Sequence, residues 1–302
     1  MDPASFDPNP TLGAVQIGVL VAYVLFGVAT TQAYIYFSRF PDDSRRVKAF
    51  IVLVWSLDIA HSLCFGHVLY TFTILDFAQP QRLGAQPPKS LSVSTLFSGL
   101  TAAAVQGFYS YRIYLFTKKL FVPCILWFMA LLHFAGRVLL FATTLHTPSI
   151  LVYIQQWEWL ITTNWGLSVA TDVAISVTMV TVLYRRRSNA HRKTAALVDK
   201  LIVWTIETGL LTSATSLVML GSFLKSKENF TWLAFHAIGT QLFTNSLIAS
   251  MNSRASLRSR DPIALSSLSS NRPVPPGVHI QTVKHVTYEG EEVPPQKIPE
   301  DV

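Results

Sequence analysis

The chain has 302 residues, of which half are hydrophobic and only 14% are charged, and its mean hydropathy is positive. A soluble domain usually carries about 25% charged residues, so this composition argues against a soluble protein and for a polytopic membrane protein. The formal net charge of +7 comes largely from residues at the ends of apolar runs. Because these are not interleaved with exposed aromatic residues, the charge does not support a nucleic-acid partner.

Seven runs of the sequence are long enough to cross a bilayer as helices. Each exceeds the ~20 residues that span a hydrocarbon core of ~30 Å at 1.5 Å per residue. In chain order they are Leu12–Ser38, Val47–Leu75, Leu91–Phe116, Leu120–Leu145, Gln156–Tyr184, Val198–Leu224 and Thr231–Ser253. The third run is the weakest, because Ser, Thr and Gln dilute it. We therefore expect an all-α fold, a seven-transmembrane-helix bundle over residues 12–253 that lies in a lipid bilayer.

The ends of these runs predict an orientation. The first run is too long for a cleaved signal peptide and no basic residue precedes it, so we expect it to remain as a helix. Cytoplasmic flanks are enriched in Lys and Arg. The flanks after the first, third, fifth and seventh runs hold most of these residues: Arg39, Arg45, Arg46, Lys48, Lys118, Lys119, Arg185, Arg186, Arg187, Arg192, Lys193, Lys200, Arg254, Arg258 and Arg260. Residues 1–11 are thus expected outside or in a lumen, and the C-terminus in the cytoplasm.

Two features of the predicted outer side concern modification. The sequon Asn229-Phe230-Thr231 makes Asn229 a candidate for glycosylation, which agrees with the orientation. Both cysteines, Cys64 and Cys124, lie inside predicted spans, so we expect no disulfide outside.

The composition changes after the seventh run. Residues 254–302 are rich in Ser, Pro and charge and cannot bury a core, so we expect a disordered cytoplasmic tail. Within it, VHIQTVKHVTY alternates as a strand does and could add to the sheet edge of a partner. This tail and the basic loop 185–200 are the candidate surfaces for a cytoplasmic protein partner.

Blocks along nearly the whole membrane part carry a resemblance to a known family. They are GVATTQAYIYFSRFPDD, VWSLDIAHSLCFGHVLY, QGFYSYRIY, ATDVAISVTMVTVLYRRR, TIETGLLTSATSLV and FTNSLIASMNSRASLR, in this order. Together they resemble a large fungal family of seven-helix membrane proteins that is catalogued as a domain of unknown function. The resemblance implies fold and topology, and it implies no activity. One departure is Glu207, where the family pattern reads Asn-Thr-Gly.

Polar side chains inside the predicted spans form the candidate site. A charge at the bilayer centre costs ~2.5–3.5 kcal/mol on insertion scales, so such residues usually face the bundle interior or a cavity. Counted from the predicted cytoplasmic helix ends, four of these residues lie roughly 14–18 Å deep, namely Asp58, His133, Asp172 and Glu207. Arg137 lies about one turn further out. The candidate residues for ligand binding or for an intramembrane polar network are Asp58, His61, His133, Arg137, Asp172, Glu207, Gln241 and Asn245.

The spacing within the helices predicts partners for these residues. Asp58 and His61 are three positions apart, and His133 and Arg137 four apart, so each pair shares a helix face. We expect Arg137 to pair with Asp172, which has a serine four positions away on each side. Asp58 is the second choice, with His61 as its own local partner. Whether this layer surrounds a ligand cavity or only joins the helices stays open at this point.

Three functions fit a bundle of this kind. A receptor-like sensor fits the architecture. Two segments depart from the common receptor motifs: in SYRIY, at the end of the third run, no acidic residue precedes the arginine, and the seventh run reads TNSLIASMN in place of Asn-Pro-x-x-Tyr. A transporter of small solutes or protons is the alternative. The sequence shows no inverted repeat, which argues against a transporter. A zinc lipid hydrolase using His61, His133 and His236 with Asp58 is the third, and the predicted depths of two of its histidines differ by roughly 7 Å. We expect that the protein is not an enzyme and that it has no cofactor and no metal site. We expect it in the plasma membrane or another membrane of the secretory pathway.

Overall fold

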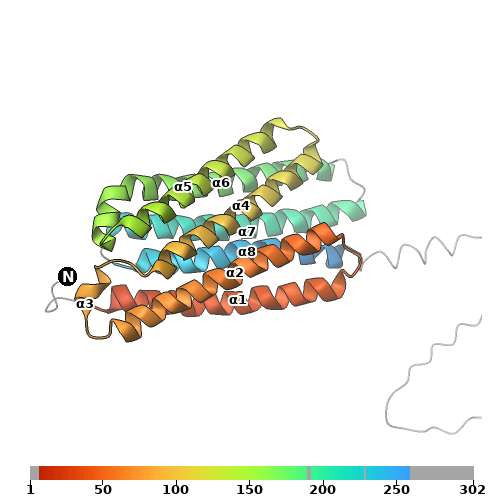
Figure 1. Ribbon diagram of the computed structural model, residues 1–302. Helices are drawn as coiled ribbons and strands as arrows, with labels where there is room; N and C mark the ends of the chain where they lie inside the picture. The colour runs from red at the N-terminus through yellow and green to blue at the C-terminus, as the bar shows by residue number, and fades with distance from the viewer. Residues whose placement is uncertain (1–6, 189–191, 228, 259–302) are drawn as a thin grey trace, which may run out of the picture. The chain divides into compact units, whose positions relative to one another are not determined.

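The structure is a computed structural model that describes residues 7–188, 192–227 and 229–258. In this part of the chain every regular element is a helix. They are η1 (Asn9–Gly13), α1 (Ala14–Arg39), α2 (Arg45–Tyr70), η2 (Thr71–Leu75), α3 (Pro80–Leu83), α4 (Lys89–Thr117), α5 (Phe121–His146), α6 (Ile150–Ser188), α7 (Arg192–Lys225) and α8 (Thr231–Arg258). The long helices lie roughly side by side in one bundle (Figure 1). We call the end at which α1 begins the N-terminal end of the bundle.

Six of the helices are long and apolar enough to cross a membrane, by length and composition. They are α1, α2 and α4 to α7, so the chain has the character of an integral membrane protein. The run Leu91–Phe116, which was expected to be the weakest, is among them as α4. The predicted seventh span forms α8, a helix of 28 residues that is more polar than the others.

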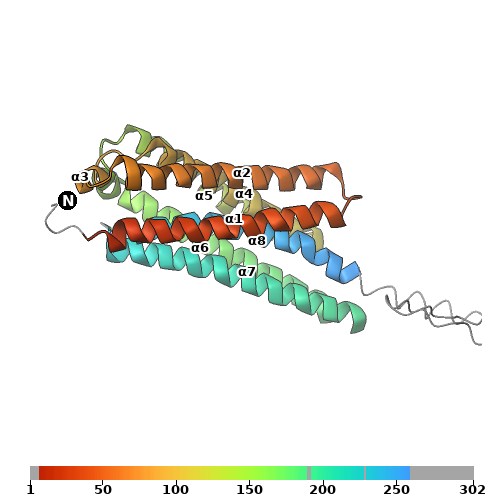
Figure 2. The same cartoon turned by 90° about the horizontal axis from the view of Figure 1, so that it is seen from below.

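Helix α8 lies between α1 and α7 (Figures 1 and 2). It also contacts α2 and α4. From Thr231 to Arg254 no residue of α8 is exposed. A helix that contacts protein on all sides does not need a lipid-like surface, because its polar groups can bond to neighbouring helices. The lower apolar content of α8 follows from its central place.

The predicted basic loop 185–200 is mostly helical, which corrects the expected boundaries. Helix α6 continues to Ser188, and α7 begins at Arg192 and not at Val198. Arg and Lys are good helix formers. An ion pair of 2.6 Å between Arg187 and Asp199 links the two helix ends. At its other end α6 begins at Ile150, six residues before the prediction, and it bends at Trp157, where the backbone leaves helical geometry.

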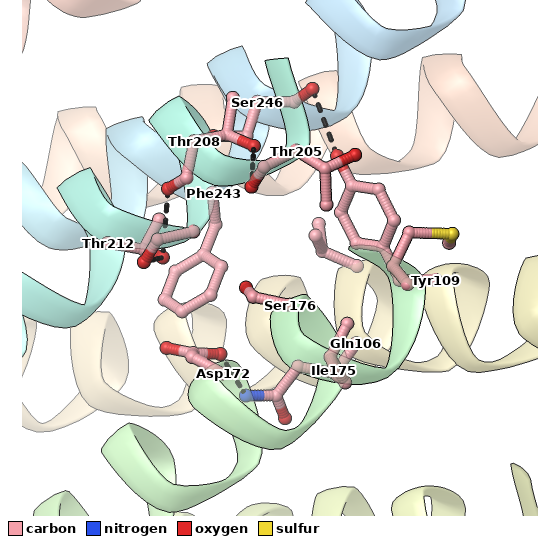
Figure 3. A pocket seen from close by; sticks show the side chains of 13 residues that line it. Gln106, Tyr109, Asp172, Ile175, Ser176, Thr205, Thr208, Thr212, Phe243 and Ser246 are labelled. Carbon is pink, nitrogen blue, oxygen red and sulfur yellow. Dashed lines mark hydrogen bonds between the residues drawn. The ribbon is translucent and has the colours of Figure 1, made fainter. Parts of the chain in front are cut away.

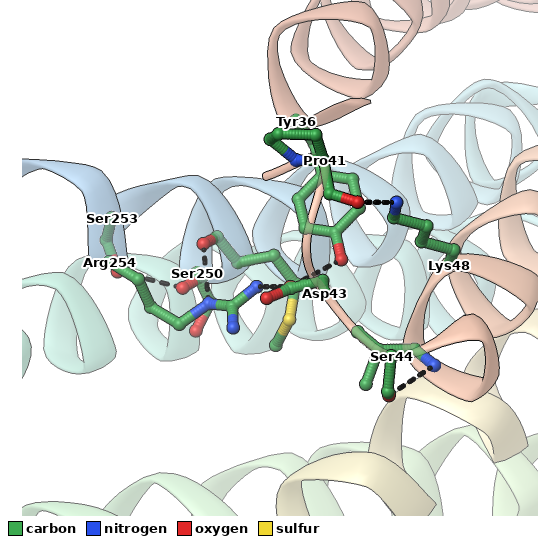
Figure 4. A network of polar contacts seen from close by, with 10 residues as sticks. Tyr36, Pro41, Asp43, Ser44, Lys48, Ser250, Ser253 and Arg254 are labelled. Atoms are coloured by element: carbon green, nitrogen blue, oxygen red, sulfur yellow. Dashed lines mark hydrogen bonds and ion pairs between the residues drawn. The ribbon is translucent and has the colours of Figure 1, made fainter. Parts of the chain in front are cut away.

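The predicted tail is also partly helical, because α8 runs on to Arg258. Arg254 donates to the Asp43 carboxylate at 2.6 Å, and its guanidinium lies 4.8 Å from the centroid of the Phe40 ring. Figure 4 shows this contact between the α1–α2 connection and the last turns of α8. Residues 259–302, including the strand-like VHIQTVKHVTY, lie outside the described residues.

Candidate functional site

Four basic side chains from three helices meet inside the bundle, and we call them the basic cluster: His61 of α2, His133 and Arg137 of α5, and His236 of α8. At most 6% of any of them is exposed. Arg137 Nε lies 3.4 Å from His133 Nε2, and the rings of His61 and His236 are 6.0 Å apart between centroids. The predicted shared face of His133 and Arg137 is thus confirmed.

The predicted ion pair between Arg137 and Asp172 is wrong. No carboxylate of the described residues lies within ion-pair distance of Arg137. Its guanidinium lines the same cavity as Trp165, and Asp172 lies seven residues further along α6, which is roughly 10 Å along the helix axis. The error arose because depths were counted from predicted helix ends. Helix α6 continues to Ser188, past the predicted end at Tyr184, so a count from that end does not give the depth of Asp172.

Arg137 and His236 lie in the wall of a cavity of about 50 Å³. Three aromatic residues form much of the remaining wall: Trp165, Phe223 and Trp232, with ring centroids 5.1 to 5.9 Å apart. Other lining residues, Pro87 and Ile150, belong to the N-terminal end of the bundle. We call this space the aromatic cavity. It combines an apolar wall with a buried cation, a combination suited to a ligand with one anionic group.

Gln241 and Asn245 join helices and do not line the aromatic cavity. The Gln241 amide donates to Ser62 Oγ of α2 at 2.9 Å. The Asn245 amide donates to the carbonyl oxygen of Leu25 in α1, also at 2.9 Å. The sequence left open whether the polar residues surround a ligand cavity or only join the helices. Gln241 and Asn245 join helices.

Asp58 is fully buried, and its carboxylate accepts no hydrogen bond that meets normal geometry from the part of the chain that the structure describes. The side chain of Thr244 approaches it from α8. Both ring nitrogens of His61 also lack a partner in that part. The expected local pair of Asp58 and His61 is therefore wrong, although both side chains point into the bundle as predicted. Sharing a helix face brings two residues onto one side without making their polar atoms meet.

Asp172 belongs to a second cavity, of about 40 Å³. Gln106 of α4 donates to Asp172 Oδ1 at 2.9 Å (Figure 3). Hydroxyl groups of α6 and α7 complete much of the polar wall, from Ser176, Thr205, Thr208 and Thr212. The aromatic cavity and this Asp172 cavity share no lining residue. The single layer that the sequence predicted is thus two separate polar sites.

Glu207 is exposed, which corrects the expectation that it faces inward with the other acids. The inward face of α7 carries Thr212, Ser216 and Met219, which are buried. Glu207 is five positions before Thr212, a rotation of about 140° from it around the helix. It lines an open groove of about 280 Å³ together with Arg112. Arg112 donates to Ser250 Oγ of α8 at 2.6 Å.

Three residues that the sequence analysis left out of its site belong to these arrangements. His236 was considered only as a zinc ligand, Gln106 was treated as a diluting polar residue, and Trp165 was not singled out. Gln106 had a usable signal, since it is the one amide in its span. In the described residues no group of three or more His, Cys, Asp or Glu side chains could hold a metal ion. Asn229 lies in the turn before α8, at the N-terminal end of the bundle.

Comparison with known proteins places part of the chain in context. Residues 168–256 match the family model described as a family of unknown function (DUF6534). The match includes Asp172, Glu207 and His236, and it leaves out Asp58, His133 and Arg137. No curated protein matches the chain, and no solved structure does. The comparisons therefore agree with a membrane protein of unknown function and name no activity.

Proposed function

We propose that this protein is a receptor-like sensor in the membrane, whose ligand occupies the aromatic cavity and is held by Arg137 and His236. The observation that carries this proposal is the buried guanidinium of Arg137, which lines a cavity without a carboxylate partner in the described residues. An uncompensated charge in such a place is costly, and a ligand anion would offset that cost. The ligand class is a small carboxylate of about the size of acetate, because the cavity has a volume of about 50 Å³.

We further propose that α8 is a seventh transmembrane helix. Its 28 residues are enough to cross a bilayer, and it has no exposed residue from Thr231 to Arg254. It contacts α1, α2, α4 and α7, which are all long and apolar enough to span. The resemblance to the fungal seven-helix family supports the same count.

The proposed orientation has the N-terminus outside and the C-terminus in the cytoplasm. The Lys and Arg residues near helix ends gather at the end of the bundle opposite the N-terminal end, which is the cytoplasmic pattern. With this orientation the aromatic cavity lies in the outer half, where a ligand from outside can reach it. The basic segment 185–200 and the tail then face cytoplasmic proteins, as a signalling partner requires. The plasma membrane or another secretory-pathway membrane fits such a sensor.

A transporter is the alternative function, and a single feature of the structure weighs against it. The two cavities share no lining residue, and hydrogen bonds cross the bundle between them, from Thr240 to Ser98 at 3.1 Å and from Gln241 to Ser62. A sensor needs only one binding site and this arrangement supplies it. The zinc hydrolase gains no support, because the converging histidines are not arranged as a set of metal ligands. We propose that the protein is not an enzyme.

The proposal is tested by the thermal unfolding of the purified full-length protein with a panel of short aliphatic monocarboxylates, which a cavity of about 50 Å³ can hold. Each carboxylate is compared with its amide, which has the same shape without the charge. We expect several carboxylates to raise the unfolding midpoint in a saturable way, and Arg137→Gln to remove the effect. Arg112→Gln is the control, since the Arg112 side chain is partly buried and contacts Ser250 outside the cavity. Equal responses of the two variants, or of acids and amides, would overturn the binding site.

A second measurement separates the sensor from the transporter. The protein is reconstituted into liposomes preloaded with a carboxylate that stabilises it, and exchange against radiolabelled external carboxylate is followed. A sensor should show binding to the protein without accumulation inside the vesicles. Saturable accumulation that Arg137→Gln abolishes would favour transport through the same site.

A further inference from the structure

The Asp172 cavity has a surplus of acceptor atoms. Asp172 is 5% exposed, and only its Oδ1 accepts a hydrogen bond, from the Gln106 amide. Its Oδ2 and the Gln106 Oε1 are buried without a partner in the described part of the chain. Figure 3 shows the Asp172 carboxylate opposite the hydroxyl-bearing side chains of α7. Buried acceptor atoms usually have a hydrogen-bond donor or a cation as partner, so we expect such a partner for these two oxygen atoms.

The neighbouring hydroxyl groups add more acceptor capacity. Thr208 donates to the carbonyl oxygen of Trp204 at 2.8 Å, and Thr212 donates to that of Thr208 at 3.2 Å. Each hydroxyl thereby uses its only hydrogen on its own helix, and its lone pairs remain for another group. The Ser176 hydroxyl lies directly against Gly209, where a Cβ atom would collide with it. The absent side chain at Gly209 thus gives this hydroxyl its place between α6 and α7.

The charge of Asp172 has no compensation from the protein. No Lys, Arg or His lines its cavity, and it takes part in no ion pair among the residues that the structure describes. A buried carboxylate without a partner either takes up a proton or attracts a cation. The atoms available to bind a cation here are oxygen atoms alone, and oxygen ligands are preferred by hard cations such as Na⁺. One carboxylate matches a single positive charge, and the several carboxylates typical of a Ca²⁺ site are lacking in the described residues.

A route to this cavity is visible in the adjoining groove. The groove shares Tyr109, Thr205, Thr208 and Ser246 with the Asp172 cavity, and it has a volume of about 280 Å³. Glu207 lines it, and an exposed carboxylate at the approach raises the local concentration of cations. Arg112 lines the groove as well, with one of its nitrogens on Ser250.

We propose that Asp172, Gln106 and Ser176 form a binding site for a monovalent cation of the size of Na⁺, which enters from the groove beside Glu207. This site is separate from the aromatic cavity and does not depend on the proposed function. A cation held there links α4 and α6 through their oxygen atoms. Its binding stabilises the folded bundle by mass action.

The test is thermal unfolding of the full-length protein in detergent, at pH 7.5, with NaCl replaced stepwise by choline chloride. Chloride and ionic strength stay constant, so an anion effect at Arg137 cannot produce the result. We expect the unfolding midpoint to rise saturably with Na⁺, and Asp172→Asn to abolish the rise. Asp58→Asn is the matched control and should keep it, because Asp58 is equally buried but is not part of this cavity.

Two further measurements protect the test against a variant that fails to fold. Ser176→Ala keeps the charge and removes one oxygen, and it should raise the apparent dissociation constant for Na⁺ several-fold. Binding of radioactive Na⁺ to the purified protein should be weakened by Ser176→Ala and abolished by Asp172→Asn. Asp58→Asn should bind Na⁺ as the wild-type protein does. Equal midpoints in NaCl and choline chloride, together with a midpoint that changes only with pH, would mean that Asp172 holds a proton, and this would overturn the proposal.

Discussion

Asp43 and Arg254 form an ion pair of 2.6 Å that joins the α1–α2 connection to the end of α8. Tyr36 donates its hydroxyl to the same Asp43 oxygen at 2.7 Å (Figure 4). The Arg254 guanidinium lies over the Phe40 ring. Only 17% of the Asp43 side chain is exposed. This partial burial separates the contact from an ordinary surface ion pair, which contributes little to stability.

The first prediction concerns this pair. Asp43→Asn and Arg254→Gln should each lower the free energy of unfolding, and the double variant should lose less than the two single losses added together. The expected coupling is about 1 kcal/mol, at the upper end for partly exposed pairs. The comparison is the Asp76–Arg82 pair, with 3.5 Å between its atoms and an arginine 61% exposed. A coupling as large at that pair would remove any special role from Asp43.

The second prediction is that the point of truncation decides the fate of a shortened chain. The sequence predicted a disordered tail from residue 254 onward, but Arg254 makes the contacts just described. Deletion of residues 259–302 should leave expression and monodispersity unchanged, whereas deletion of residues 254–302 should lower the unfolding midpoint. Size-exclusion chromatography and thermal unfolding in the same detergent give the comparison. The idea fails if both truncations behave alike.

The third prediction concerns the close approach of α1 and α8. A Cβ atom at Gly18 would lie 2.5 Å from the Cα and Cβ atoms of Ala234, so Gly18→Ala must push the two helices apart. We expect a loss of about 1–3 kcal/mol, as for other overpacked interiors. Gly27 of the same helix has no atom within 4 Å of such a Cβ. Gly27→Ala should therefore be neutral or slightly stabilising, since Ala is the better helix former.

The fourth prediction follows from the missing pair between Arg137 and Asp172. Effects of substitutions at separate sites add to within about 0.5 kcal/mol, whereas partners in an ion pair show a coupling. The effects of Arg137→Leu and Asp172→Asn on unfolding should therefore be additive. Recovery of stability in the double variant would show that the two residues act as a pair after all.

The fifth prediction tests the proposed orientation. A tag at the C-terminus should be cut when sealed microsomes are treated with protease, because their outer surface is the cytoplasmic side. A lumenal marker protein must stay intact in the same sample, and must be cut once detergent opens the vesicles. Protection of the tag would reverse the orientation and move the aromatic cavity to the cytoplasmic half.

Much of the helical architecture could be read from the sequence, since an apolar run of sufficient length has few alternatives to a helix in a bilayer. Helix ends were less certain. The runs at 185–200 and after Ser253 look like loop and tail by composition, but α6 continues to Ser188, α7 begins at Arg192 and α8 continues to Arg258. Charged residues such as Arg187 and Asp199 stabilise a helix end through contacts that a hydropathy profile does not register.

The sequence by itself determined which polar residues enter the apolar helices, and for Asp58, His61, His133, Arg137 and Asp172 this was enough to predict burial. Only the tertiary structure decided which of them meet. Helical periodicity fixes the face of a residue within its own helix, but the partner depends on the axial shift and rotation between helices. Those are set by packing, as at Gly18 and Gly209. They place Arg137 beside aromatic rings, bring Asp172 to Gln106, and turn Glu207 to an open groove.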